Sequence, residues 1–281
     1  MRKVINYCLL LGVSLTLTIQ ALAKSSIIQV DTSHQQLLEN EAFFYRVASN
    51  QLLSSVYEDI LGNQLGNTFQ WLQIFAEDQL LNFSPNDYWI LDNNPSGGFE
   101  LYDEEFNYIS VAPDLKGNFS FISSKGNWVK SRSNNFNKTY FSTDQGKEYT
   151  MTFKFSFGGK KVIKDEKGYE ITLNSKLNGN TEIADNEGRK LLVKFDRSGV
   201  YRLLEGKKIK MSLMIQSLQH YRLSNESGEL LNLVKRGRYN DIYMKLSNGQ
   251  EILIENRFVK PIPIQVQEDK KEAEKKEVEK K

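Results

Sequence analysis

Apolar and polar residues alternate along the second half of the chain with the two-residue period of a β-strand. The runs 150–157, 169–174 and 209–215 place Met, Phe, Tyr, Ile or Leu at every second position and mostly polar residues between them. Successive side chains of a strand point to opposite faces of a sheet, so each run predicts a strand with one buried and one wet face.

Short sequences rich in Asp, Asn and Gly separate such runs between residues 147 and 259. In a turn of this kind the Asp or Asn side chain bonds its own backbone, and Gly supplies positive φ. We therefore interpret this stretch as a β-meander of hairpins. The spacing of the turns looks irregular, and we find no propeller or solenoid period. The turns are Asp165-Glu166-Lys167-Gly168, Asp185-Asn186-Glu187-Gly188, Asp196-Arg197-Ser198-Gly199, Asn225-Glu226-Ser227-Gly228 and Ser247-Asn248-Gly249.

Helical periodicity in residues 33–81 predicts a helical hairpin laid against the sheet. Ser33 with Gln36 forms a capping-box signal, Gly62 is a stop signal, and Asn67 begins a second cap. The predicted buried stripes are Leu38, Ala42, Tyr45, Leu52, Val56 and Ile60, followed by Phe69, Leu72, Ala76 and Leu80.

These patterns predict a mainly β (α+β) protein. We expect an antiparallel β-meander that forms a sandwich or a partly open barrel, with an N-terminal helical hairpin. Aromatic density from residue 86 onward predicts further strands. The predicted segments are a signal peptide at 1–23, a helical segment at 24–85, a β-rich domain at 86–267 and a charged disordered tail at 268–281.

Residues 1–23 have the pattern of a secretory signal peptide. Arg2 and Lys3 precede the apolar run Leu9–Leu17, and Ala21-Leu22-Ala23 is an A-x-A cleavage site. The single cysteine, Cys8, lies in this segment, so the mature chain would fold without disulfides. We expect a periplasmic or secreted protein of a bacterial envelope that is not transmembrane after cleavage.

Charge is unevenly distributed along the chain. Residues 24–120 contain fourteen acids and three bases, whereas residues 121–267 contain fifteen acids and twenty-six bases. The two halves could pack and neutralise each other, or the basic half could face an anionic glycan, a lipid head group or an envelope protein. Nucleic acid is a poor candidate for an exported protein. The candidate residues for an anionic partner are Lys207, Lys208, Lys235, Arg236 and Arg238.

Catalytic side chains are scarce, so we expect a protein that is not an enzyme. Beyond Cys8 there is no cysteine, and neither His34 nor His220 lies in a nucleophile motif, which disfavours zinc sites and nucleophile-histidine catalysis. Carboxylate-dependent glycan hydrolysis leaves no sequence signature and stays open. The acids to test first would be Glu100, Asp103, Glu104 and Glu105.

One local pattern resembles the calcium loop of an EF-hand. Asp92, Asn94, Ser96, Gly97 and Asp103 stand at its positions 1, 3, 5, 6 and 12, which supply oxygen ligands and the sharp turn. The alternative is an ordinary Asn/Pro/Gly hairpin loop. We expect no other cofactor.

Three tryptophans, Trp71, Trp89 and Trp128, accompany the aromatic stretch. Aromatic residues in a β protein usually form its core, but exposed rings can stack on sugars. The sequence therefore favours an exported, non-catalytic envelope protein that binds or scaffolds another envelope component. The alternative is a β protein that binds or hydrolyses glycans, and a third hypothesis is a carrier with a large apolar cavity.

Overall fold

In the part of the chain that it describes, the computed structural model contains two helices followed by a sheet of 17 strands. It describes residues 32–76, 88–134, 137–155, 159–196, 198–217, 219–237 and 239–257. The predicted signal peptide and charged tail lie outside these residues. The helices are α2 (Thr32–Leu61) and α3 (Asn63–Phe75), and the strands are β1 (Tyr88–Asn93), β2 (Phe99–Asp103), β3 (Tyr108–Pro113), β4 (Phe119–Ser123), β5 (Trp128–Ser133), β6 (Lys138–Thr143), β7 (Glu148–Lys154), β8 (Lys160–Asp165), β9 (Glu170–Ser175), β10 (Thr181–Asp185), β11 (Lys190–Phe195), β12 (Val200–Glu205), β13 (Lys208–Ser217), β14 (His220–Asn225), β15 (Gly228–Arg236), β16 (Asp241–Leu246) and β17 (Glu251–Asn256).

The sheet closes on itself as a barrel. Each strand pairs antiparallel with the next, and β1 pairs both with β2 and, in parallel, with β17. Because strands alternate in direction, the first and last of an odd number run the same way, and their pairing must be parallel. The predicted mainly β antiparallel meander is confirmed. Closure through β1 and β17 confirms the barrel of the two predicted alternatives, and the barrel is closed where we expected a partly open one.

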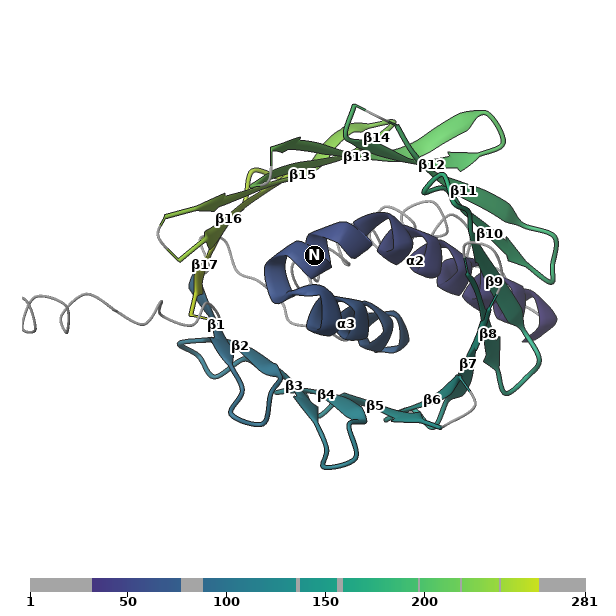
Figure 1. Cartoon of the computed structure of the whole chain (residues 1–281), viewed down its shortest axis with the longest axis horizontal. Helices are drawn as coiled ribbons and strands as arrows, with labels where there is room; N and C mark the ends of the chain where they lie inside the picture. Colours follow the sequence, from purple (N-terminus) through teal and green to yellow (C-terminus); the bar gives the residue numbers. More distant parts are fainter. Residues whose placement is uncertain are drawn as a thin grey trace, which may run out of the picture.

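The helical hairpin lies inside the ring of strands (Figure 1). Strands about 4.8 Å apart and tilted by about 40° give a 17-strand barrel a diameter of about 34 Å. Two helices of about 10–12 Å each, with the inward side chains of the sheet around them, fill that width. The hairpin is therefore confirmed as an element, but the sheet surrounds it, and it is not laid against one face.

The inward side chains of the strands and both helices form one apolar core. Phe75 of α3 packs on Phe141 and Tyr149, with ring centroids 4.3 and 4.7 Å apart. Side chains of α2 and α3 occupy the barrel interior, which leaves no support for the apolar-carrier hypothesis. No helix in the described part of the chain is long and apolar enough to cross a membrane.

Burial on α2 differs from the predicted stripe because the helix has neighbours on several sides. Leu38 and Ala42 are exposed, where α2 begins at one end of the barrel, whereas Leu52, Val56 and Ile60 are buried as predicted. On α3 every residue from Phe69 to Phe75 is buried, so this half of the helix has neighbours on all sides. A polar side chain also joins the helices, because Gln70 Nε2 of α3 donates to Asn50 O of α2 over 3.0 Å; within α2, Tyr57 Oη donates to Asn50 Oδ1 over 3.1 Å.

The turns are regular over two parts of the chain, which partly corrects the interpretation of irregular spacing. Residues with positive φ recur at intervals of nine and eleven in alternation from Gly97 to Gly146 and again from Gly159 to Gly199, but the alternation does not continue beyond Gly199. The sequence hides this period because two of the positions hold Phe106 and Asn137 in place of Gly. Within the turns the predicted side-chain bonds are present: Asp165 Oδ1 accepts from the backbone N–H of Lys167 and Tyr169 over 2.9 and 2.7 Å. The first positions of the series are Gly97, Phe106, Gly117, Gly126, Asn137 and Gly146.

The antiparallel order gives the barrel two distinct ends. Turns that follow odd-numbered strands lie at one end, here the odd rim, and turns that follow even-numbered strands lie at the other, here the even rim. α2 begins at the even rim, where Gln36 contacts Lys167 of the β8–β9 turn. It ends near the odd rim, where Asp59 contacts Lys235 at the end of β15.

Candidate functional site

The predicted cationic residues do not converge on one face. Lys235 points into the barrel, where its Nζ lies 2.7 Å from Asp59 Oδ2, so it is not open to an anionic partner. Arg236 points outward, with its guanidinium 5.8 Å from the Tyr243 ring. Lys207 and Lys208 lie at the opposite, even rim, where Lys208 pairs with an acid over 3.0 Å. Arg238 is outside the described residues.

Two of the three tryptophans have no free ring face. Trp89 and Trp71 are buried, the first facing the core from β1 and the second on α3 under the Nζ of Lys161 at 4.7 Å. A sugar cannot stack on either ring, so their predicted role was wrong. Trp128 on β5 is half-buried, and Lys130 Nζ lies 4.8 Å from its ring.

The resemblance to a calcium loop is not realised. Asn94 and Ser96 form the β1–β2 turn at the odd rim, whereas Asp103 pairs with Trp89 at the far end of the hairpin. Five residues of extended strand separate these groups by about 16 Å, too far for one ion. Asp103 Oδ1 instead accepts backbone N–H bonds in the next turn. The hairpin-loop alternative is correct.

The acids and histidines singled out in the sequence form no catalytic constellation. Glu100 Oε1 accepts from Asn94 Nδ2 over 3.1 Å on the outer face, and His220 Nε2 lies 2.9 Å from Asn232 Oδ1 on another part of that face. Glu104 and Glu105 are exposed turn residues. The side chain of His34 is outside the described ones. Within the described residues no three His, Cys, Asp or Glu side chains gather to hold a metal ion.

A strip of basic residues on the outer face was missed by the sequence analysis. Its members come from β5, β6, β7 and β8, and none of them forms an ion pair with a described residue. Inward-facing Val129, Phe141 and Tyr149 on β5 to β7 fix their outward direction, because the strand period is two. The residues of the strip are scattered along the sequence, and only the register of the strands places them side by side. A correct register would therefore have revealed the strip. The basic strip is Lys130, Arg132, Lys138, Lys154 and Lys160.

The geometry of the basic strip is suited to an anion. Lys154 and Lys160 are direct partners across β7 and β8, so two lysine side chains leave the same outer face from neighbouring positions. Arg132 lies 5.4 Å from the Tyr140 ring. Together with Lys130, these two residues line a hollow of about 600 Å³ on the outer face of β4 to β7, whose lining also includes the acids Asp114 and Glu148.

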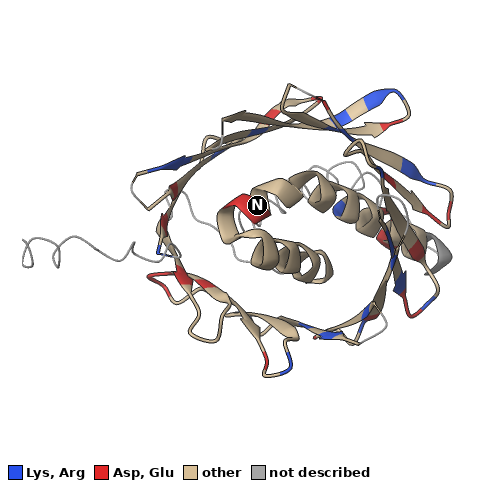
Figure 2. Ribbon diagram, in the orientation of Figure 1, with Lys and Arg blue, Asp and Glu red and all other residues tan. Residues whose placement is uncertain are grey.

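The charge asymmetry is only partly neutralised inside the molecule. The Asp59–Lys235 pair joins the acidic and basic halves of the sequence. By contrast Lys164, for example, pairs with Glu170 of its own half at 2.6 Å. Figure 2 shows acidic residues near β1 and β2 and basic residues along the wall from β5 round to β16. The outer wall therefore keeps an uncompensated positive region at the basic strip.

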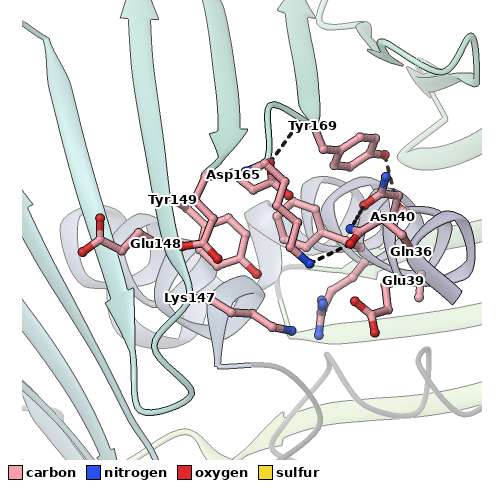
Figure 3. A pocket seen from close by; sticks show the side chains of 13 residues that line it. Gln36, Glu39, Asn40, Lys147, Glu148, Tyr149, Asp165 and Tyr169 are labelled. Carbon is pink, nitrogen blue, oxygen red and sulfur yellow. Dashed lines mark hydrogen bonds between the residues drawn. The ribbon is translucent and has the colours of Figure 1, made fainter. Parts of the chain in front are cut away.

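A second hollow, a pocket of about 350 Å³, opens at the even rim between α2 and the turns before β7 and β9 (Figure 3). Its inner side is aromatic: Phe43 stacks on Tyr149 with centroids 5.2 Å apart. Tyr169 Oη lies 3.1 Å from Asn40 O, and burial raises the pKa of its phenol, which stays protonated at neutral pH. The lining residues are Gln36, Glu39, Asn40, Ala42, Phe43, Arg46, Lys147, Glu148, Tyr149, Asp165, Glu166, Lys167 and Tyr169.

The charges around this pocket are mixed. Lys167 Nζ donates to Gln36 Oε1 over 2.7 Å, and Asp165 is engaged in its own turn, as described above. Glu39 remains as a carboxylate at the edge of the pocket, whereas the side chain of Glu148 points away from it toward the outer face of β7 (Figure 3). A pocket with both signs of charge and an aromatic wall suits a polar, uncharged ligand better than an anion.

Comparisons with known proteins do not identify the chain. No protein-family model matches it, and no curated protein does. Among solved structures it is similar to a mutant of the TCP10 domain of Danio rerio CPAP, at 14% identity over 58% of this chain and 96% of that one, with a TM-score of 0.17. It is also similar to the SAS-4 TCP domain of Drosophila melanogaster in complex with a proline-rich motif of Ana2, at 13% identity over 62% and 97%, with a TM-score of 0.18. Likeness at these scores carries no argument about this protein.

Proposed function

We propose that this protein is a non-catalytic, exported component of a bacterial envelope, and that its basic strip binds an anionic envelope partner. The observation that carries the proposal is the direct pairing of Lys154 with Lys160. Like charges directly opposite one another destabilise a sheet. An anion between them would convert the repulsion into two charge-assisted contacts.

The surroundings of this pair support the proposal. Lys138 is exposed on the neighbouring strand and faces Thr152 across β6 and β7, so no acid screens it within the strip. Hydroxyl groups of Ser142 and Thr150 line the adjoining hollow, beside Glu148, and can donate to phosphate, sulfate or carboxylate oxygens. The signal-peptide pattern of residues 1–23 supports export. Cell fractionation tests this, and full-length chain retained in the cytoplasm would contradict an exported location.

The test is a salt-dependent binding assay on two anionic probes, heparin and vesicles of phosphatidylglycerol with phosphatidylcholine. The strip variant carries Lys138→Thr, Lys154→Thr and Lys160→Thr, since threonine is a good strand former. We expect the wild type to bind both probes and to lose affinity as salt rises through about 0.1–0.5 M, because screening shortens to below 10 Å. We expect the strip variant to bind at least tenfold more weakly.

A matched variant controls for net charge. Lys164→Thr, Lys208→Thr and Lys245→Thr remove the same charge from residues that are already paired with Glu170, Glu226 and Glu251. The affinity of this control variant for both probes should stay within about threefold of the wild-type affinity. Equal losses in the two variants would show that total charge alone matters, and the strip would then not be the site.

Glycan binding at the even-rim pocket is the second candidate. It is favoured by the aromatic wall of Phe43 and Tyr149 beside the carboxylate of Glu39, a combination that suits sugar hydroxyls and ring faces. Pull-down on a panel of neutral polysaccharides, with Glu39→Gln as the variant, tests it. Release of reducing ends would indicate hydrolysis. If the wild type retains no polysaccharide, this candidate is excluded.

A further inference from the structure

The two rims of the barrel present different side chains to the surroundings. At the odd rim the tips of three turns carry large apolar side chains that are almost wholly exposed: Leu115 completely, Phe155 by 82% and Leu177 by 81%. Tyr239, at the β15–β16 turn of the same rim, is half exposed. These residues are brought to one end of the molecule by the meander, although more than sixty positions separate the first from the third.

The positions are structurally equivalent in two of the turns. Leu115 follows Asp114, and Leu177 follows Lys176, each as the second residue of a five-residue loop closed by a bond from the glycine N–H. A side chain at this position leaves the sheet and points away from the barrel wall. Phe155 directly follows the last residue of β7 and contacts Phe153, with centroids 5.2 Å apart. The predicted burial of Phe155 was therefore wrong, because β7 ends one residue before it.

Positive charge surrounds the apolar tips. Lys116 lies beside Leu115, and the Lys138, Lys154 and Lys160 end of the basic strip reaches the same rim. The nearest acid, Asp114, is turned back into its own loop, where Oδ1 accepts the N–H groups of Lys116 and Asn118 over 2.7 and 2.9 Å. Beside Leu115 and Phe155 the rim therefore combines apolar tips with lysines that form no ion pair with a described residue, whereas Lys176 beside Leu177 pairs with Glu182.

We propose that the odd rim docks on an anionic lipid bilayer, with Leu115, Phe155 and Leu177 in the interface and the neighbouring lysines on the phosphates. The inference rests on the proposed function and names its partner. The tips rise from separate turns, two or four strands apart. One groove of a folded partner would not receive them together, whereas a fluid surface admits each independently. Each lysine near an anionic surface strengthens binding about fivefold.

The test compares a tip variant with the strip variant on the same two probes. The tip variant is Leu115→Gln, Phe155→Asn and Leu177→Gln, all at exposed sites where folding should be unaffected. We expect vesicle binding to fall by about tenfold or more while heparin binding is unchanged, since heparin has no apolar interior. The control is Leu37→Gln, Leu38→Gln and Phe106→Asn, the exposed apolar residues at the even rim, which should bind vesicles like the wild type.

A direct reading of insertion comes from Leu177→Cys in a Cys8→Ser background, labelled with an environment-sensitive fluorophore. A blue shift with anionic vesicles, and none with pure phosphatidylcholine, is expected. The inference is overturned if the tip variant binds vesicles as tightly as the wild type, or if it alters self-association and leaves vesicle binding unchanged. In either case the proposed function still stands if the strip variant binds heparin more weakly than the wild type does. If the wild type binds neither probe, both proposals fall.

Discussion

Replacing Asp59 by alanine should show how the helical hairpin is tied to the barrel. Asp59 lies in the last turn of α2, and its Oδ2 contacts two inward side chains: Lys235 Nζ at 2.7 Å and Tyr221 Oη at 2.5 Å. The Lys235 side chain is 9% exposed and that of Asp59 is 32% exposed. The variant therefore leaves an ammonium group inside the barrel wall with little access to water.

The expected cost is about 2–4 kcal/mol of unfolding free energy. Removing one partner of a fully buried pair costs about 3–5 kcal/mol. Because Asp59 is partly exposed, we expect a cost at or below the lower end of this range. Loss of the Tyr221 bond adds about 1 kcal/mol. Removing a carboxylate from a helix C-terminus returns about 0.5 kcal/mol. Lys235→Met should cost only about 0–1 kcal/mol, because Asp59 keeps Tyr221 and some solvent.

Urea unfolding followed by tryptophan fluorescence measures these values. The double variant Asp59→Ala with Lys235→Met should be more stable than Asp59→Ala alone by about 1–3 kcal/mol, since it no longer buries an unpaired charge. Glu104→Ala, in an exposed turn, is the control and should change stability by less than about 0.5 kcal/mol. The reasoning is refuted if Asp59→Ala is as stable as this control, or if the second substitution recovers nothing.

Further predictions concern close packing and pH. Gly66→Ala should destabilise the protein by about 1–3 kcal/mol although alanine has the better helix propensity, because the added Cβ would lie 2.5 Å from the backbone of α2. The control Gln64→Ala, at an exposed position of the same helix, should be neutral or slightly stabilising. Equal effects of the two substitutions on the thermal midpoint would contradict the clash. Phe75→Ala should cost about 3–5 kcal/mol in urea, and a cost below about 1 kcal/mol would mean that the ring is not packed as described. Burial, followed by the charge of Glu205, raises the pKa of Tyr45 to about 12. Its contribution to stability should be present below about pH 10 and lost as pH rises toward 12, so Tyr45→Phe should flatten the alkaline part of the stability profile; an identical profile would contradict this.

Local patterns in the sequence determined the element types of this protein. Alternating apolar residues specify strands because side chains of a strand alternate between faces, and the helical run ends at Gly62, where the structure also breaks the two helices. The Asp-x-x-Gly turns were readable because their bonds form within five residues. Such interactions need no distant partner, so a single sequence contains the information for them.

Closure, enclosure and the surfaces were decided only by the tertiary structure. Whether β1 meets β17 depends on tilt and strand number, and these also place the hairpin inside the barrel. The buried pair of Asp59 and Lys235 joins positions far apart in sequence, so Lys235 looked like a surface cation. Lys154 and Lys160 become neighbours through strand register. Leu115 and Leu177 reach one rim because each follows an odd-numbered strand of a closed meander, a relation between strands that alternation within one strand cannot specify.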